Sequence, residues 1–358
     1  MCGTSATDDL LVVAAAREAA DEILADLRVP VAKALDLSTA HGFDLAVTRL
    51  AARLHRLTAK SDAEALRQAL QVLDVDWRAT SPAQRSALVR RALEAAGRAT
   101  APVSRAIAAP FGRAATEVVQ ATRGDSRRRH RLAIAADLNG LDRRAIEHVT
   151  RANTLFVRDG YGTRLEAFGQ RVRETVARGL EAGLGRDAIA EDLVILAEAG
   201  LVRQATSYWT VVAASFVGEA RSLSQISSYA EARIERYVLM AVLDEHTTNA
   251  CRFLDGKVLE TAAAVRTIER LEASDDPLAI KRERPWVRER VSDDGKRHLA
   301  VDGTTGPTIL AVVERSGVGA LDDRGVYSRT LSSRDLAPAG IGFPPFHGLC
   351  RTTTVPDI

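Results

Sequence analysis

The chain has 358 residues and a formal net charge of +2, so it is long enough for two or three domains and its overall charge does not indicate a nucleic-acid-binding protein. Three cysteines are too few for a disulfide scaffold, which indicates folding in the cytosol. The sequence has no apolar stretch of the ~18 residues that a membrane span needs, and its start lacks the positive charge typical of a signal peptide.

Helical patterns fill the first part of the chain. Aromatic residues make up 4% of the sequence and alanine is abundant, a composition that favours closely packed helices. The stretch from Ser61 to Glu64 has a capping-box pattern, and Ser81 to Gln84 repeats it with Pro82 in the first turn. The expected helices cover residues 10–27, 35–57, 61–73 and 82–99, followed by helical sequence that extends past Pro102 and Pro110 to Ala121.

Residues 123–131 form the most basic run of the chain. Glycine and serine lie among the arginines, so we expect an exposed linker or loop. Arg127, Arg128, Arg129 and Arg131 are candidates for contact with DNA phosphates, and the alternative is a solvated connection. No aromatic residues alternate with these arginines as they do in many single-strand-binding proteins, which favours the solvated connection.

Helical periodicity returns over residues 132–240. One helix is expected to start at Asp142, a second to cover residues 161–184, and a short third one to run from Gly185 to near Gly200. Gly183 marks the turn before the third helix, because glycine tolerates the left-handed conformation that ends a helix.

Beyond Met240 the pattern changes to α+β. Residues 285–302 alternate around an Asp-Asp-Gly turn and predict a β-hairpin, and residues 308–313 predict a further strand or short helix. Residues 237–243 fit either a helix end or a buried strand. We therefore expect a mainly α protein with a C-terminal α+β module, divided into residues 1–122, the basic run 123–131, residues 132–240 and the module 241–358.

Two motifs in this last region hold two of the three cysteines. The first runs from Asp244 to Val258, and the second runs from Phe343 to Arg351. Together they resemble the closing signature of the phage Mu F-like head morphogenesis family, the minor head proteins of tailed phages. The positions that carry the resemblance are Asp244, Thr247, Cys251, Leu254, Asp255, Gly256, Pro344, Pro345, His347, Cys350 and Arg351.

The chain departs from the family pattern at two cysteine positions. Thr248 stands where the family usually has its first cysteine, and Thr352 stands where it has its last. The thiols that remain are Cys251 and Cys350, with His347 three residues before Cys350. A site with four thiolate ligands cannot form from these residues alone.

Three interpretations of Cys251, His347 and Cys350 stay open. In the first, the motifs meet and their buried thiols close a small domain, either free or as a disulfide if the Cα atoms approach within about 7 Å. In the second, the three residues bind a structural zinc ion, with His246 or Asp244 completing a tetrahedral set. In the third, one thiol is a nucleophile activated by His347. No cofactor other than zinc is expected.

Three further side chains near the motifs have open roles. Arg252 and Arg351 each follow a matched cysteine, and either could pair with Asp244 or Asp255 or lie in solvent. His298 lies in the predicted hairpin and is expected to be exposed.

The resemblance implies a non-enzymatic minor head protein of a phage or prophage. Such a protein would bind the portal or major capsid protein in the host cytoplasm during procapsid assembly, enter the virion, and in some systems affect DNA packaging or ejection. One alternative is a toxin-like or transferase enzyme built on a Mu F-like module, although the chain ends at Ile358, shortly after Cys350, so an effector domain is not expected after the motif. The other alternative is a DNA-binding accessory protein that uses residues 123–131 and 281–290.

Overall fold

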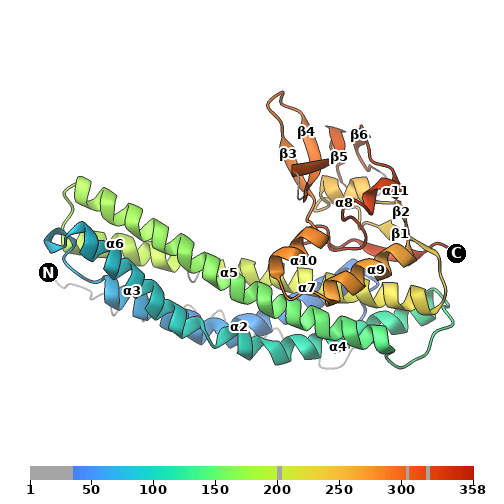
Figure 1. The fold of residues 1–358 in the computed structure, drawn as a ribbon, viewed down its shortest axis with the longest axis horizontal. Coiled ribbons are helices and arrows are strands. Elements are labelled where there is room, and N and C mark those ends of the chain that lie inside the picture. The colour runs from blue at the N-terminus through green and yellow to red at the C-terminus, as the bar shows by residue number, and fades with distance from the viewer. Residues whose placement is uncertain (1–34, 200–203, 304–305, 320–322) are drawn as a thin grey trace. The chain divides into compact units, whose positions relative to one another are not determined.

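A computed structural model describes residues 35–199, 204–303, 306–319 and 323–358. Asp36–Ile358 form one compact unit, and the helix expected over residues 10–27 lies outside the described residues. Helices make up this unit as far as Glu231, and short helices with two small antiparallel sheets follow, as Figure 1 shows. The expected fold class, mainly α with a C-terminal α+β module, is confirmed.

Long helices form the first part of this unit. They are α2 (Ala40–Leu73), the one-turn 3-10 helix η1 (Trp77–Ala79), α3 (Pro82–Thr100), α4 (Val103–Arg129), α5 (Gly140–Glu181), α6 (Arg186–Ala197) and α7 (Gln204–Glu231). Small side chains of α2 and α3, such as Ala69 and Ala96, are fully buried against Phe168 of α5 and Leu193 of α6. The abundant alanine thus allows close helix packing, as the composition predicts.

Helix α7 lies inside the helical part and contacts α2, α4, α5, α9 (Thr261–Glu272) and the last strand, β7 (Thr353–Pro356). Every residue from Phe216 to Tyr229 is buried. A helix that is buried on all faces occupies the centre of a fold, so α7 is the element around which the others pack.

Two predicted local signals are confirmed. Ser81 accepts a hydrogen bond from the Gln84 amide, the Gln84 side chain accepts one from the Ser81 amide, and α3 starts at Pro82. The turn expected at Gly183 separates α5 from α6.

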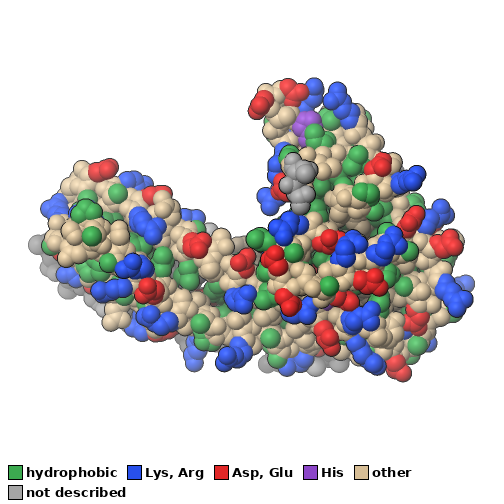
Figure 2. Space-filling model, viewed as in Figure 1, with side chains coloured by type: hydrophobic (Ala, Val, Ile, Leu, Met, Phe, Trp, Pro, Cys, Tyr) green, Lys and Arg blue, Asp and Glu red, His purple; other side chains and the backbone are tan. Residues whose placement is uncertain are grey.

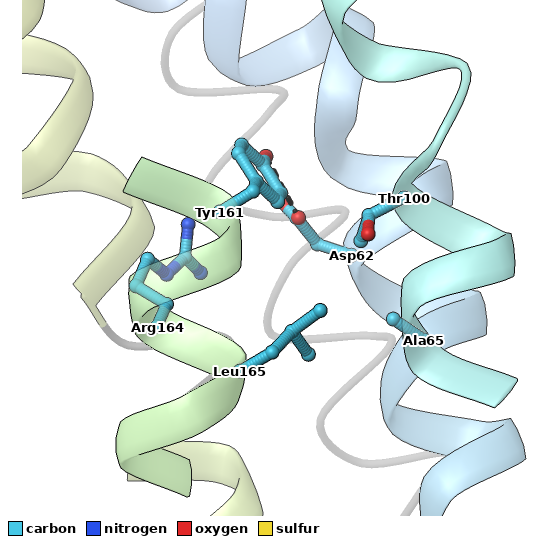
Figure 3. A pocket seen from close by; sticks show the side chains of 6 residues that line it. All are labelled: Asp62, Ala65, Thr100, Tyr161, Arg164 and Leu165. Carbon is cyan, nitrogen blue, oxygen red and sulfur yellow. Dashed lines mark hydrogen bonds between the residues drawn. The ribbon is translucent and has the colours of Figure 1, made fainter. Parts of the chain in front are cut away.

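The helix start predicted at Ser61 is wrong, because α2 continues through it and is capped at Thr39 instead. Asp62 is buried and accepts a 2.9 Å hydrogen bond from the Tyr161 hydroxyl of α5, and Figure 3 shows the two side chains together. They border a cavity of about 10 Å³, room for one water molecule. Burial and the neighbouring Asp62 raise the pKa of Tyr161, which keeps the phenol protonated as the donor. Glu64, the acid of the predicted capping box, instead pairs with Arg67 of the same helix at 2.6 Å, while Asp62 is held by a partner in another helix.

The two helices expected between Asp142 and Leu184 are one helix, α5. Asn139 caps it, accepting a hydrogen bond from the Asp142 amide, while the Asp142 carboxylate accepts one from the Asn139 amide. Tyr161, the expected second start, lies inside α5 and packs against Tyr208 of α7 with 6.3 Å between the ring centroids. Tertiary packing therefore sustains one 42-residue helix.

The basic run is not a loop, because α4 extends to Arg129 and includes most of it. Arg123 is buried and forms ion pairs with Asp142 at 2.9 Å and Glu231 at 2.6 Å. The arginines proposed to contact DNA are exposed as predicted, and three of them occupy the last turn of α4, where the helix dipole stabilises cations. They are Arg127, Arg128, Arg129 and Arg131.

The C-terminal region contains two antiparallel sheets and several short helices. In chain order its remaining elements are β1 (Arg236–Met240), α8 (Asn249–Leu254), β2 (Val258–Glu260), α10 (Pro277–Glu283), β3 (Arg288–Val291), β4 (Arg297–Gly303), β5 (Gly306–Arg315), β6 (Val326–Ser328) and α11 (Ser333–Leu336). One sheet has the order β2-β1-β7 and the other the order β3-β4-β5-β6. The predicted hairpin is β3–β4, and the ambiguous segment after residue 236 is the strand β1.

His298 is half-buried and not exposed as expected. It lies in β4, and its Nε2 is 2.8 Å from the Ser292 hydroxyl across the hairpin. The side chain therefore links the two strands of the hairpin.

Replacing Arg123 by Ala should lower the free energy of unfolding by about 3–5 kcal/mol, because Asp142 would stay buried without its cation. Arg127→Ala, at an exposed position of the same helix, is the control and should change it by less than about 0.5 kcal/mol. Urea unfolding followed by circular dichroism measures both. An Arg123→Ala variant as stable as the parent would contradict a structural role for this ion cluster.

Candidate functional site

The first motif forms a capped helix followed by a tight turn. Thr248 caps α8 by accepting a hydrogen bond from the Cys251 amide at 3.4 Å. Gly256 follows α8 with φ of 77°, a conformation that favours glycine, and its amide donates to the Leu239 carbonyl at 2.8 Å. Asp255 accepts a hydrogen bond from the Ala241 amide at 2.9 Å. The Asp-Gly pair thus turns the chain back so that β2 pairs with β1.

The second motif packs against α7 through a close backbone approach. A Cβ atom added to Gly348 would lie 2.7 Å from Cγ1 of Val211, so a larger residue would displace the loop. Pro344 and Pro345 are buried, and Arg284 donates to the Pro344 carbonyl at 3.0 Å. The backbone of this loop therefore contacts Val211 of α7 at Gly348 and the Arg284 side chain at Pro344.

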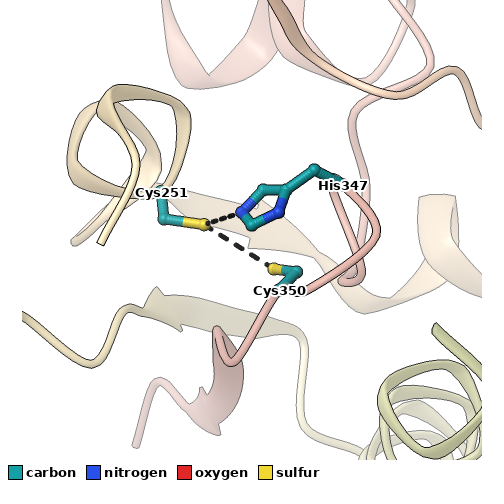
Figure 4. Close-up of side chains that lie close together, drawn as sticks. All are labelled: Cys251, His347 and Cys350. Carbon is teal, nitrogen blue, oxygen red and sulfur yellow. Dashed lines mark hydrogen bonds between the residues drawn. The ribbon is translucent and has the colours of Figure 1, made fainter. Parts of the chain in front are cut away.

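The two motifs meet at their cysteines, as predicted from their pairing. Sγ of Cys251 lies 3.6 Å from Sγ of Cys350 and 3.1 Å from Nε2 of His347, although Cys251 and Cys350 are 99 residues apart in sequence. Figure 4 shows the three side chains converging from α8 and from the loop before β7. Both thiols are free and buried, and His347 is half-buried.

The two thiols differ in acidity. A hydrogen bond to Cys350, together with burial, raises the pKa of Cys251. Burial alone would raise the pKa of Cys350, but the hydrogen bond from Cys251 and the nearby His347 outweigh it and lower this pKa. The pKa of Cys350 therefore lies below that of Cys251.

A second contact joins the motifs beside the cysteines. Arg351 forms an ion pair with Asp244 at 2.5 Å, one of the pairings open from the sequence. Asp255 instead pairs with Arg324 at 2.6 Å. Arg252 pairs with neither acid: it is buried and donates to main-chain carbonyls, among them Asp244 at 2.6 Å and Asp323 at 2.6 Å.

The three ligand atoms could hold one metal ion. They lie within 4.8 Å of one another, and no further His, Cys, Asp or Glu of the described residues joins the group. The expected fourth ligands are not placed there: His246 is exposed beside Glu245, and Asp244 is engaged by Arg351. The Thr248 hydroxyl, 3.1 Å from Nε2 of His347, is the nearby oxygen. Two thiolates and an imidazole suit zinc better than a hard cation.

Arg221 of α7 supports the site and was not recognised in the sequence. It is buried and donates to the carbonyls of Arg351 at 3.0 Å and Thr352 at 2.7 Å. Its guanidinium also lies 4.5 Å from the ring centroid of Phe43 in α2. The sequence feature that could have indicated this role is a charged residue within a long stretch of small and apolar residues. Such a residue must find polar partners when its helix is buried.

The chain matches no protein-family model, curated protein or solved structure with which it was compared. No helix among the described residues has the length and apolar character needed to cross a membrane.

Titration with Zn²⁺ is expected to give roughly one bound ion per chain, because two thiolates and an imidazole already converge. Cys350→Ser should weaken the affinity at least about tenfold, measured against a chromophoric chelator, since one thiolate ligand is lost. Cys2→Ser, which removes the third thiol, is the control. Binding of less than about 0.1 zinc per chain would reject the metal site.

Proposed function

We propose that this protein is a non-enzymatic minor head protein of a tailed phage or prophage. In this proposal it binds the portal protein, the major capsid protein or both in the host cytoplasm, joins the procapsid and stays in the virion. The observation that supports it most is the contact between Cys251, His347 and Cys350. A two-part signature is expected to meet in space if its halves form one structural unit.

The surroundings of the thiols favour a structural over a catalytic role. Cys350 is fully buried, with Sγ of Cys251 3.6 Å from its own Sγ. A substrate could reach this sulfur atom only if the C-terminal module opened. The enzyme alternative therefore requires a conformational change that the scaffold interpretation does not need.

The DNA-binding alternative has less support. The arginines at the end of α4 are already explained by the helix dipole and by ion pairs such as Arg128–Asp125 at 3.1 Å. On the face drawn in Figure 2, positive and negative side chains are interspersed over the helices. Such a mixed surface suits protein contacts better than the continuous positive track that phosphate binding favours.

Copurification tests the proposal directly. The tagged chain is coexpressed with the portal and major capsid proteins encoded by neighbouring genes, and particles are isolated after nuclease treatment in high salt. We expect the chain to stay with the portal or the particles, because protein contacts do not depend on DNA. Loss of the chain from both would refute the proposal, and recovery that disappears with nuclease or salt would favour the DNA-binding alternative.

Cys251→Ser or Cys350→Ser should lower the free energy of unfolding by about 1–3 kcal/mol and reduce particle incorporation, because a buried hydroxyl costs more to remove from water than a thiol and cannot reproduce the contact between the two sulfur atoms. Denaturant unfolding and particle assays measure the two effects, with Cys2→Ser as the control. A folded, normally incorporated variant that had lost a hydrolase or transferase activity would favour the enzyme instead.

A further inference from the structure

A groove of about 580 Å³ lies between the helical part and the C-terminal module. One wall comes from α5 and α7, with Phe156, Tyr208 and Val212, and the other comes from α10 and the segment after it, with Leu278 and Trp286. Its volume falls in the range of about 300–1,000 Å³ typical of binding pockets. The groove is separate from the thiol cluster, because none of the three metal-ligand candidates lines it.

Large apolar side chains on the groove remain exposed. Leu278 is 59% exposed and Trp286 is 42% exposed, although apolar side chains of α5 and α7 lie across the groove from them. Exposing neighbouring apolar groups to water is unfavourable relative to covering them. Exposed apolar side chains that gather on one groove are typical of an interaction site.

The rim of the groove carries three exposed cations beside the exposed carboxylate of Asp302. Lys281, Arg282 and Arg288 lie on it with side chains 57%, 56% and 63% exposed. Their internal ion pairs are long, between 3.6 and 3.9 Å, and their acidic partners are more than half exposed. Such pairs contribute little stability, so carboxylates of a partner could compete for these cations at small cost.

The floor of the groove is polar but already satisfied. Glu219 accepts hydrogen bonds from Arg284 at 2.8 Å and from Asn153 at 3.2 Å. Because these buried groups pair with one another, they form a fixed base and do not select a charged ligand. Selection is left to the apolar walls and the cationic rim.

The amide of Val287, next to Trp286 in the groove wall, already donates to the Phe346 carbonyl at 2.9 Å. A strand added at this point would find no free amide there, whereas a helix satisfies its own backbone hydrogen bonds.

We propose that this groove binds the apolar face of an amphipathic helix of a partner protein, with acidic residues of that helix on the cationic rim. The proposal goes beyond the head-protein assignment and holds whichever protein carries the helix. Gly348 of the second motif lies against both Trp286 and Val211, so the groove and the cysteine motif share one loop.

A pair of designed helical peptides tests the proposal. Both carry leucines at i, i+3, i+4 and i+7, one with glutamates and the other with lysines beside them. Fluorescence anisotropy of the labelled peptides gives the affinity. Acrylamide quenching of the intrinsic fluorescence reports the location, because Trp77 and Trp209 are buried and Trp286 is partly exposed. The acidic peptide should bind at least about tenfold more tightly than the basic one and shield Trp286.

One wall variant, one rim variant and two matched controls identify the surface. Leu278→Asp and Lys281→Glu should each weaken binding of the acidic peptide at least about tenfold. Ile195→Asp is the control for Leu278→Asp, because Ile195 is an apolar residue outside the groove and is 60% exposed. Arg90→Glu is the control for Lys281→Glu, because Arg90 is an exposed cation outside the groove with an ion pair of 3.9 Å. Both controls should bind as the parent does, and circular dichroism checks that every variant is folded.

Three results would overturn the proposal: no binding of the acidic peptide, equal binding of both peptides, or binding that leaves Trp286 quenchable. Equal losses in the two groove variants and in the controls would also overturn it, since the contact would then lie elsewhere. Because the test uses the purified chain with peptides alone, its result is independent of copurification with portal or capsid.

Discussion

The placement of the C-terminal module depends on the hydrogen bonds that Arg221 of α7 donates to it. Burial lowers the pKa of this guanidinium to about 10, yet it stays charged at neutral pH and must keep polar partners. It finds them in the carbonyls of Arg351, the last residue of the second motif, and of Thr352, which follows it. Gln225 and Tyr229 follow at intervals of one helical turn and bond to Thr354. One face of α7 is therefore a polar strip that fixes β7.

The cysteine cluster follows from that attachment. Strand β7 pairs with β1, β1 pairs with β2, and the Asp255-Gly256 turn connects β2 to α8. Once β7 is fixed on α7, the same small sheet determines where α8 lies, and Cys251 with it. The Asp244–Arg351 ion pair adds a second link between the same two segments. Two cysteines far apart in sequence thus become neighbours through a short series of backbone pairings.

Local signals in the sequence were reliable where no distant partner competed with them. The Ser81 cap and the β3–β4 hairpin formed as predicted, because each is complete within a few residues. The start expected at Ser61 failed, since Asp62 is bonded to Tyr161, 99 residues away. Likewise the basic run was interpreted as a loop because Asp142 and Glu231, the partners of Arg123, lie 19 and 108 residues further along. Of the site, the two motifs and their meeting could be predicted, whereas Arg221 and the carbonyl contacts of Arg252 required the fold.

Thr248 and Thr352 stand where the signature that the motifs resemble has cysteines, and this bears on what a metal ion would contribute. Small zinc domains often unfold without the ion because they lack a sufficient core. This module has a core of its own, with Leu254, Leu299 and Leu310 fully buried and Phe253 packed on Tyr327 at 5.4 Å between ring centroids. Thr248 keeps a structural role as the cap of α8. A zinc ion held by the remaining ligands would then stabilise a fold that already exists, by an amount set by its concentration and affinity. Threonine at these two positions is compatible with this architecture because hydrogen bonds and apolar burial hold the motifs together.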